Sequence, residues 1–192
     1  MSPAVYFAMG TLGYSMSISL DGYVEDPTGS IAFSDPDDEV HRFANDQTRQ
    51  TAAFLFGRGL YEVMEEFWTA PERADGHEVE AEFAELYVAT PRIVFSDSLT
   101  SVAPGCRLVR RAEAVDEVVR LKKETDGDLG VGGAGLAASL LDLIDEFRPT
   151  VVPAFLGGGK PYFPVGADLR LRLVEQRAFR GGAVFLRYAR VG

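Results

Sequence analysis

Short apolar runs alternate along this chain with segments of helical periodicity. Four runs are rich in β-compatible residues and end at a turn or a polar side chain, which is typical of strands. They are residues 14–19, 53–56, 92–95 and 129–131. Between them, apolar residues recur at three- and four-residue spacing in segments that we expect to be helices. Their apolar positions are Val40, Phe43 and Ala44; Leu60, Val63, Met64 and Phe67; and Val115, Val118 and Val119.

The boundaries of several elements also follow from local signals. Ser34 or Asp35 can cap the first helix, which we expect to begin at Pro36. The acidic stretch 72–85 is typical of a solvated helix, and residues 151–156 resemble a buried strand.

Two final strands at residues 169–179 and 183–191 are separated by Gly181 and Gly182, which predicts a hairpin with a primed turn. Strands that alternate with helices and then close in an antiparallel hairpin indicate a three-layer α/β domain with a mixed, mostly parallel sheet.

Composition limits the kind of protein. With 192 residues, of which 46% are hydrophobic, we expect one domain over 1–192, with 1–11 as an extra N-terminal segment. A net charge of -10 argues against nucleic acid or an anionic membrane as partner. No apolar run reaches the roughly 18 residues of a membrane span, and the N-terminus lacks the basic start of a signal peptide. We therefore expect a cytoplasmic protein.

The sequence gives little indication of a metal site or of a reactive cysteine. Cys106 is the single cysteine and follows a Pro-Gly turn, so an inert thiol is the favoured interpretation. His41 and His77 are the two histidines and have no metal-ligand spacing. We expect no metal site.

Two glycine clusters carry the strongest chemical signal. Gly132, Gly133 and Gly135 stand between a strand and a helix, where backbone amides can hold a diphosphate. With Gly130 they also fit the Rossmann fingerprint, but they come late in the chain and lack the acidic residue that should follow about 20 positions later. The second cluster ends at Lys160 and is not a P-loop, because Ala154 and Pro161 replace required residues.

Four motifs occur in one order: S-L-D-G-Y at 19–23, F-G-R-G-L-Y-E at 56–62, V-F-S-D-S-L at 94–99, and the glycines at 132–135. In this order the chain resembles the dihydrofolate-reductase-like fold. The closest resemblance is to the branch that contains the C-terminal reductase domain of bacterial riboflavin-biosynthesis enzymes. That resemblance implies NADPH as cofactor, a small-molecule substrate and a homodimer formed through sheet or hairpin surfaces.

The resemblance also implies roles for individual residues. Arg58 with Gly57 would bind phosphates of NADPH, although a surface ion pair with Glu62 is the simpler alternative. Ser96 would contact the ribose or its 2′-phosphate, while Asp97 would repel that phosphate, so the preference for NADPH over NADH is a hypothesis. The remaining cofactor residues are Ser17 and Val24 beside the nicotinamide, and Gly132, Gly133, Ala134, Gly135 and Leu136 beneath the diphosphate. A cis peptide bond is expected between Gly132 and Gly133.

Candidates for the proton donor are carboxylates. Asp38 is our candidate among the acidic residues that open the first helix, although an N-terminal charge cluster with Arg42 or His41 is the simpler interpretation. Asp21 is the second candidate, with turn stabilisation as its alternative. Lys160 is expected either to contact the substrate or to be solvated.

The sequence therefore predicts an NADPH-dependent reductase of a small polar substrate, pterin- or pyrimidine-like. One alternative is a nucleotide-binding protein on the same scaffold that has no turnover and no acid in the nicotinamide pocket. A weaker alternative is a true dihydrofolate reductase, for which methotrexate binding would be a test. No zinc motif of a deaminase is present, so a bifunctional riboflavin enzyme is not expected.

Overall fold

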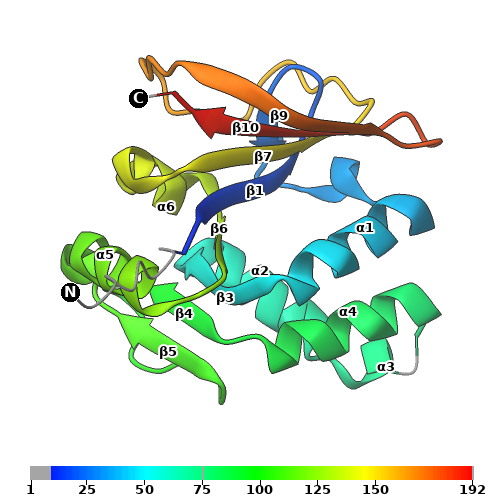
Figure 1. The fold of residues 1–192 in the computed structure, drawn as a ribbon. Coiled ribbons are helices and arrows are strands. Elements are labelled where there is room, and N and C mark those ends of the chain that lie inside the picture. Colours follow the sequence, from blue (N-terminus) through cyan, green and yellow to red (C-terminus); the bar gives the residue numbers. More distant parts are fainter. Residues whose placement is uncertain (1–9, 75, 192) are drawn as a thin grey trace, which may run out of the picture.

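The computed structural model describes residues 10–74 and 76–191, and Figure 1 shows their arrangement. Residues 1–9 of the expected N-terminal segment lie outside this part. Eight strands form one sheet in the order β5-β4-β3-β6-β1-β7-β10-β9. Their bounds are β1 Leu12–Ile18, β3 Thr51–Gly57, β4 Arg92–Phe95, β5 Cys106–Val109, β6 Asp128–Gly132, β7 Glu146–Val151, β9 Leu171–Ala178 and β10 Val184–Arg190.

All neighbouring strands from β5 to β7 are parallel, and β10 is antiparallel to both β7 and β9. The predicted mixed, mostly parallel sheet with an antiparallel C-terminal hairpin is confirmed. A second, two-stranded sheet pairs β2 (Tyr23–Glu25) with β8 (Lys160–Pro161).

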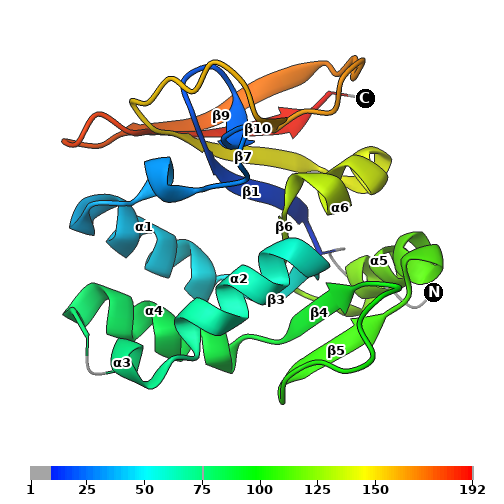
Figure 2. The same cartoon turned by 180° about the vertical axis from the view of Figure 1, so that it is seen from behind.

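Helices cover both faces of the large sheet. Figures 1 and 2 show α1 (Asp38–Arg49) and α4 (Glu78–Ala89) together on one side, with α5 (Ala114–Glu124) and α6 (Ala134–Ser139) on the other. The helix α2 (Arg58–Trp68) packs beside α4 through Tyr61, and the short α3 (Pro71–Ala74) connects the two. No helix in the described part of the chain is long and apolar enough to cross a membrane.

Helix α1 is held by the C-terminal hairpin. The ring centroid of Phe43 lies 4.7 Å from that of Phe185 and 5.4 Å from that of Phe179. At the start of the helix, Asp37 caps it by accepting from the amide of Val40 at 2.9 Å, so the predicted caps Ser34 and Asp35 are wrong. The amide of Arg180 in the hairpin donates to Glu39. The hairpin therefore fixes both the position and the first turn of α1.

Three sequence predictions fail where tertiary pairing overrides local pattern. The strand expected at 151–156 is β7, Glu146–Val151, which contains Pro149 and the buried Arg148. A search for apolar strand patterns would not expect a proline and an arginine within a strand. Here ion pairs compensate the cost of burying the charged arginine. The strand β5 was not predicted. The expected solvated helix at 72–85 is split into α3 and α4, and α4 buries Val79 and Phe83 against its neighbours.

The hairpin is confirmed, but its predicted primed turn is wrong. The amide of Gly182 donates to Phe179 O, and the amide of Phe179 donates to Ala183 O. Only Gly182 of the two glycines has a positive φ, +90°. This arrangement is the three-residue loop with a terminal glycine bulge. A Cβ atom at Gly181 would lie 2.2 Å from Oδ2 of Asp37, so this glycine permits the hairpin to approach α1.

Phe43→Ala should destabilise the protein, because the apolar cluster between α1 and the hairpin contains only five buried residues. We expect the free energy of unfolding to fall by about 3 to 5 kcal/mol in urea denaturation. Phe155→Ala is the matched control, because Phe155 is 75% exposed and its loss should cost about 0.5 kcal/mol or less. Equal destabilisation by the two variants would contradict this account of α1.

Candidate functional site

The candidate site lies where the carboxyl ends of the parallel strands meet. The strands β3, β4 and β6 end at Gly57, Phe95 and Gly132, each directly followed by predicted cofactor residues. In open α/β sheets this edge is the usual place for ligands. Gly57 and Leu136 come together across it, since a Cβ atom at Gly57 would lie 3.6 Å from Cβ of Leu136.

Glycines leave the backbone bare between β6 and α6. A Cβ atom at Gly132 would lie 2.6 Å from Cδ2 of Leu60, so a larger residue there would displace the side chain of Leu60. Gly133 has a φ of +95°, and no side chain caps α6. Ala134 and Leu136 are buried while Gly135 is exposed, so the open side of this turn is its backbone.

The predicted cis bond between Gly132 and Gly133 is wrong, since no cis peptide bond occurs among the described residues. The positive φ of Gly133 redirects the chain from β6 into α6 instead.

Arg58 opens α2 and contacts the end of β4. Its Nη1 donates to Oγ of Ser98 at 3.2 Å, and its Nε lies 3.6 Å from Oε2 of Glu62. The simpler alternative, a pair with Glu62, is therefore present together with a contact to the β4 loop. Ser96 is buried, and its Oγ lies 3.3 Å from Oγ of Ser98 and accepts from the amide of Leu99 at 3.1 Å. Arg58, Ser96 and Ser98 thus form one polar cluster.

Two arginines after β5 complete this cluster, and the sequence analysis did not include them. Nη1 of Arg110 donates to the carbonyl oxygens of Ser96, Asp97 and Leu99. Asp97 accepts from the amide of Arg111 at 3.0 Å, so its carboxylate is directed to the short helix Arg111–Glu113. The Arg-Leu-Val-Arg segment at 107–110 was the available signal, but β5 is too short for its pattern to be distinctive.

The remaining nicotinamide candidates lie on different strands. Ser17 is half-buried near the end of β1, where it pairs with Thr150 of β7. Val24 is buried in β2 as part of the core. Their proposed backbone contacts to a carboxamide stay predictions.

Asp21 joins two loops at this edge. Its carboxylate accepts from the amides of Leu156 at 3.1 Å and Gly157 at 2.8 Å. Partial desolvation pushes the pKa of Asp21 upward, but hydrogen bonds from Ser19, Leu156 and Gly157 outweigh it and hold this pKa below its ordinary value. Its contacts are those of a loop anchor, and a catalytic role stays a prediction.

Lys160 pairs with Glu25 at 3.2 Å, where β8 meets β2. Close approach of the two loops requires Gly159, since a Cβ atom there would lie 1.9 Å from the carbonyl oxygen of Glu25. The ammonium group is thus tied to the loop that follows β1, and contact with a substrate stays a prediction.

Asp38 is not brought to the glycine turn by any contact in the described residues. Its carboxylate lies 3.2 Å from Nη2 of Arg42 and 3.7 Å from Nδ1 of His77, which immediately precedes α4. This is the N-terminal charge cluster that was the simpler interpretation. A role for Asp38 as proton donor stays a prediction without support from its neighbours.

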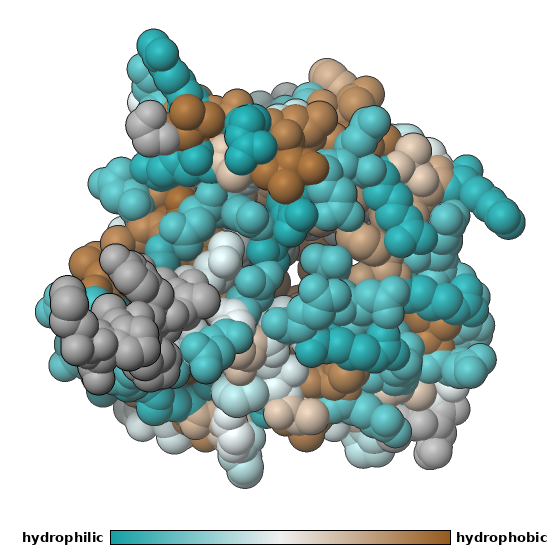
Figure 3. Space-filling view, viewed as in Figure 1, coloured by the Kyte–Doolittle hydropathy of each residue, from teal (hydrophilic) through white to brown (hydrophobic). Residues whose placement is uncertain are grey.

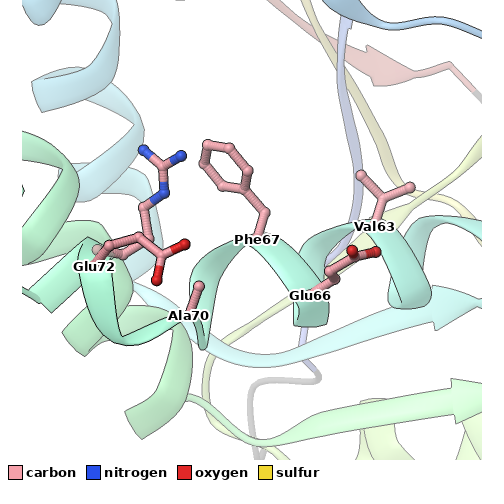
Figure 4. A pocket seen from close by; sticks show the side chains of 6 residues that line it. Val63, Glu66, Phe67, Ala70 and Glu72 are labelled. Carbon is pink, nitrogen blue, oxygen red and sulfur yellow. The ribbon is translucent and has the colours of Figure 1, made fainter.

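Two surface depressions lie elsewhere. One, of about 320 Å³, is formed by α2 and α3, and Figure 4 shows Phe67 projecting beside Val63 and Glu66. The guanidinium of Arg73 stacks on the Phe67 ring at 3.7 Å. The other, of about 730 Å³, lies between α2, α4 and the loop before β5, with Arg92 at its base. Neither contains a residue that the sequence predicted for the site.

Comparisons with known proteins agree with this geometry. The family model described as the RibD C-terminal domain matches residues 11–185. The chain is 29% identical over 179 residues to the uncharacterized protein YyaP of Bacillus subtilis (strain 168), covering 90% of this chain and 91% of that protein.

Two solved structures show the same fold. One is a putative riboflavin biosynthesis protein from Shewanella sp. PV-4, with a TM-score of 0.72, 23% identity, and coverage of 95% of this chain and 99% of that one. The other is dihydrofolate reductase from Enterococcus faecalis complexed with NADP(H) and RAB-propyl, with a TM-score of 0.65, 13% identity, and coverage of 96% and 98%.

The stabilising effect of Asp21 should depend on pH. Because its pKa is lower in the folded protein, the ionised form stabilises the fold above the unfolded-state value of about 3.9, and this effect is lost as the pH falls through the folded-state value. We expect Asp21→Ala to have a lower urea midpoint than the wild type at pH 7. The difference should disappear at a pH low enough for the Asp21 carboxyl group of the wild type to be protonated in both the folded and the unfolded state.

Asp26→Ala is the matched control, since Asp26 anchors a separate turn through the amides of Thr28 and Ser30. Hydrogen exchange at the amides of Leu156 and Gly157 should accelerate only in Asp21→Ala. Unchanged exchange there would contradict the anchor.

Proposed function

Because the chain belongs to the RibD C-terminal domain family, we propose that it is a reductase of the riboflavin-biosynthesis type that uses NADPH and a small polar substrate. The observation that carries this proposal is the bare glycine turn between β6 and α6, which faces the polar cluster of Arg58, Ser96 and Ser98 across the same sheet edge. An extended dinucleotide needs both features at once, a backbone surface for its diphosphate and cations for its outer phosphate.

The residues fit a nicotinamide dinucleotide in their chemistry. The amides of Ala134, Gly135 and Leu136 open a helix that no side chain caps, and a Cβ atom at Gly135 would have no neighbour within 4 Å, so the turn is open on this side. When bound, the cofactor supplies a hydride. Ser17 and Val24 at the start of the neighbouring loop would orient the nicotinamide through their backbone groups.

Charge at the far end of this edge supports NADPH rather than NADH. The carboxylate of Asp97 argued against a 2′-phosphate at this place, because it would repel that group. It accepts a hydrogen bond from the amide of Arg111, however, so it already has a partner. Arg58 and Arg111 are both exposed beside it. Two guanidinium groups beside a single carboxylate that already has a partner favour NADPH, which has a 2′-phosphate that NADH lacks.

A second candidate function is nucleotide binding without turnover. Each carboxylate considered as the proton donor has other partners: Asp38 pairs with Arg42 and His77, and Asp21 accepts two amides. A reductase built this way would take its proton from solvent or from the substrate. Oxidation of NADPH in a substrate screen separates the two candidates, and Asp38→Asn should leave turnover unchanged.

Arg58→Ala should weaken NADPH binding, because a charge-assisted hydrogen bond to phosphate is lost. We expect the Kd for NADPH to rise about 10- to 100-fold and that for NADH by a much smaller factor, measured by isothermal titration calorimetry. Arg107→Ala is the control, since Arg107 is also exposed but pairs with Glu117 of α5.

Thermal unfolding with each nucleotide gives an independent readout, since a ligand at about 100 times its Kd adds about 2.7 kcal/mol of stability. Stabilisation by NADPH but not by NADH is the expected result. No stabilisation by either nucleotide would overturn the proposed cofactor.

A further inference from the structure

The larger of the two surface depressions lies at the opposite end of β4 from the polar cluster. We call this depression of about 730 Å³ the amino-end hollow. Arg92, the first residue of β4, lies at its base, and Pro104 borders it just before β5 begins. The four residues of β4 separate it from Ser96 by about 13 Å. The hollow is therefore distinct from the proposed cofactor site.

Apolar side chains form most of the wall of the amino-end hollow. Helix α2 contributes Trp68, which is half-buried, and the last turns of α4 contribute Ala84, Val88 and Ala89. Its volume lies within the range of about 300 to 1,000 Å³ that is usual for small-molecule sites, which combine apolar walls with a few polar groups. The polar groups therefore decide which ligand would fit.

Glu65 is the polar group that the protein holds most firmly in this wall. Its Oε2 accepts from the hydroxyl of Tyr87 at 3.0 Å and lies 3.3 Å from Nε of Arg92. Burial and then the nearby charge of Glu65 raise the pKa of Tyr87 well above its ordinary value, so this hydroxyl remains a donor. The carboxylate of Glu65 is thus fixed in position without a ligand.

The second oxygen of Glu65 is available to a ligand. Within the described residues Oε1 makes no hydrogen bond, and solvent reaches it. Arg92, by contrast, is 2% exposed and has its partners within the protein. Its Nη1 donates to three carbonyl oxygens at the end of α4, and Nη2 donates to that of Pro104. The hollow therefore presents a free acceptor and favours a ligand that donates.

The charges in the lining leave one positive charge to be supplied. Two carboxylates, Glu65 and Glu85, and one guanidinium, Arg92, give a net charge of -1. The neighbouring helices α2, α3 and α4 strengthen this negative field, because together they contain eight glutamates and two arginines. Figure 3 shows mostly hydrophilic side chains over α1 and α4. Such a field attracts a cation into a partly desolvated hollow.

Trp68 gives the hollow an aromatic surface for that cation. Its ring centroid lies 4.5 Å from that of Phe83 and 4.7 Å from that of Phe67, so the indole is held by its neighbours. Tryptophan is the side chain that attracts an ammonium group most strongly through its ring face. Its apolar surface also suits the body of an aromatic ligand.

We propose that the amino-end hollow binds a small primary amine with an aromatic body. The ammonium group donates to Oε1 of Glu65, and the aromatic body lies against Trp68 and the small side chains of α4. Glu85 at the rim adds attraction for the positive charge. This binding site goes beyond the proposed reductase function and does not depend on it, because it lies at the other end of β4 from Ser96.

Calorimetric titration with three probes of similar shape tests the proposal. Phenethylamine is a cation at neutral pH, 2-phenylethanol is its neutral counterpart, and 3-phenylpropionate is an anion. Without nucleotide, we expect the amine to bind at least about 10-fold more tightly than the alcohol, and the anion not to bind. Trp68 is the single tryptophan, so its fluorescence emission should change only with the amine.

Three variants locate the site. Glu65→Gln should raise the Kd for phenethylamine about 10-fold through loss of a charge-assisted hydrogen bond. Because Glu65 also contacts Arg92, two exposed positions provide variants that spare this contact. Ala89→Leu should fill the hollow and raise the Kd by about 10-fold or more, and Glu85→Gln should raise it about 2- to 3-fold.

Glu66→Gln is the matched control, since Glu66 is exposed on the same helix but lines the other depression. It removes the same charge and should bind phenethylamine as the wild type does. Equal affinity of the wild type for phenethylamine and 2-phenylethanol would refute the cation site, as would an unchanged Kd in Ala89→Leu. Absence of NADPH binding together with amine binding that Ala89→Leu weakens would overturn the proposed cofactor and support this site.

Discussion

The rest of the site depends on the absence of large side chains from one face of β1 and β6. Gly13, Ser15 and Ser17 on β1 stand beside Gly130 and Gly132 on β6, and none extends far above the backbone. Larger residues at Gly13, Gly130 and Gly132 would press against the side chains of Arg148, Phe54 and Leu60. These side chains therefore occupy the space above the glycines, as close packing normally requires, next to the sheet edge where the glycine turn lies.

Helix α1 is attached to the C-terminal hairpin on one side and to α4 on the other. Its apolar side packs on Phe179 and Phe185 of the hairpin, and Asn45 on its other side donates to the carbonyl oxygen of Val79 in α4. The helix thus bridges the hairpin and α4 rather than lying directly on β1. The antiparallel hairpin therefore helps to determine where α1 lies relative to the sheet.

Electrostatic asymmetry separates the two halves of the proposed site. The outer end has exposed arginines at 58 and 111, in a chain whose net charge is -10. Over Gly13, by contrast, Asp128 and Glu146 offset the charge of Arg148. Local guanidinium groups at the outer end can therefore attract the anionic cofactor that we propose, although the net charge of the chain is negative.

Local patterns in the sequence determined the strand-helix alternation, the parallel sheet, the hairpin and the glycine turn at Gly132 and Gly133, because apolar periodicity and glycine conformation are local properties. The sequence also placed Arg58 and Ser96 directly after strands, as the structure has them, and their contacts with a cofactor stay a prediction. Only the tertiary structure decided that β7 contains Arg148 and Pro149, that Asp38 pairs with Arg42 and His77, and that Arg110 and Arg111 join the polar cluster. It also showed that Ser15 is exposed. These features depend on partners far apart in the sequence, which a single strand or helix pattern does not encode.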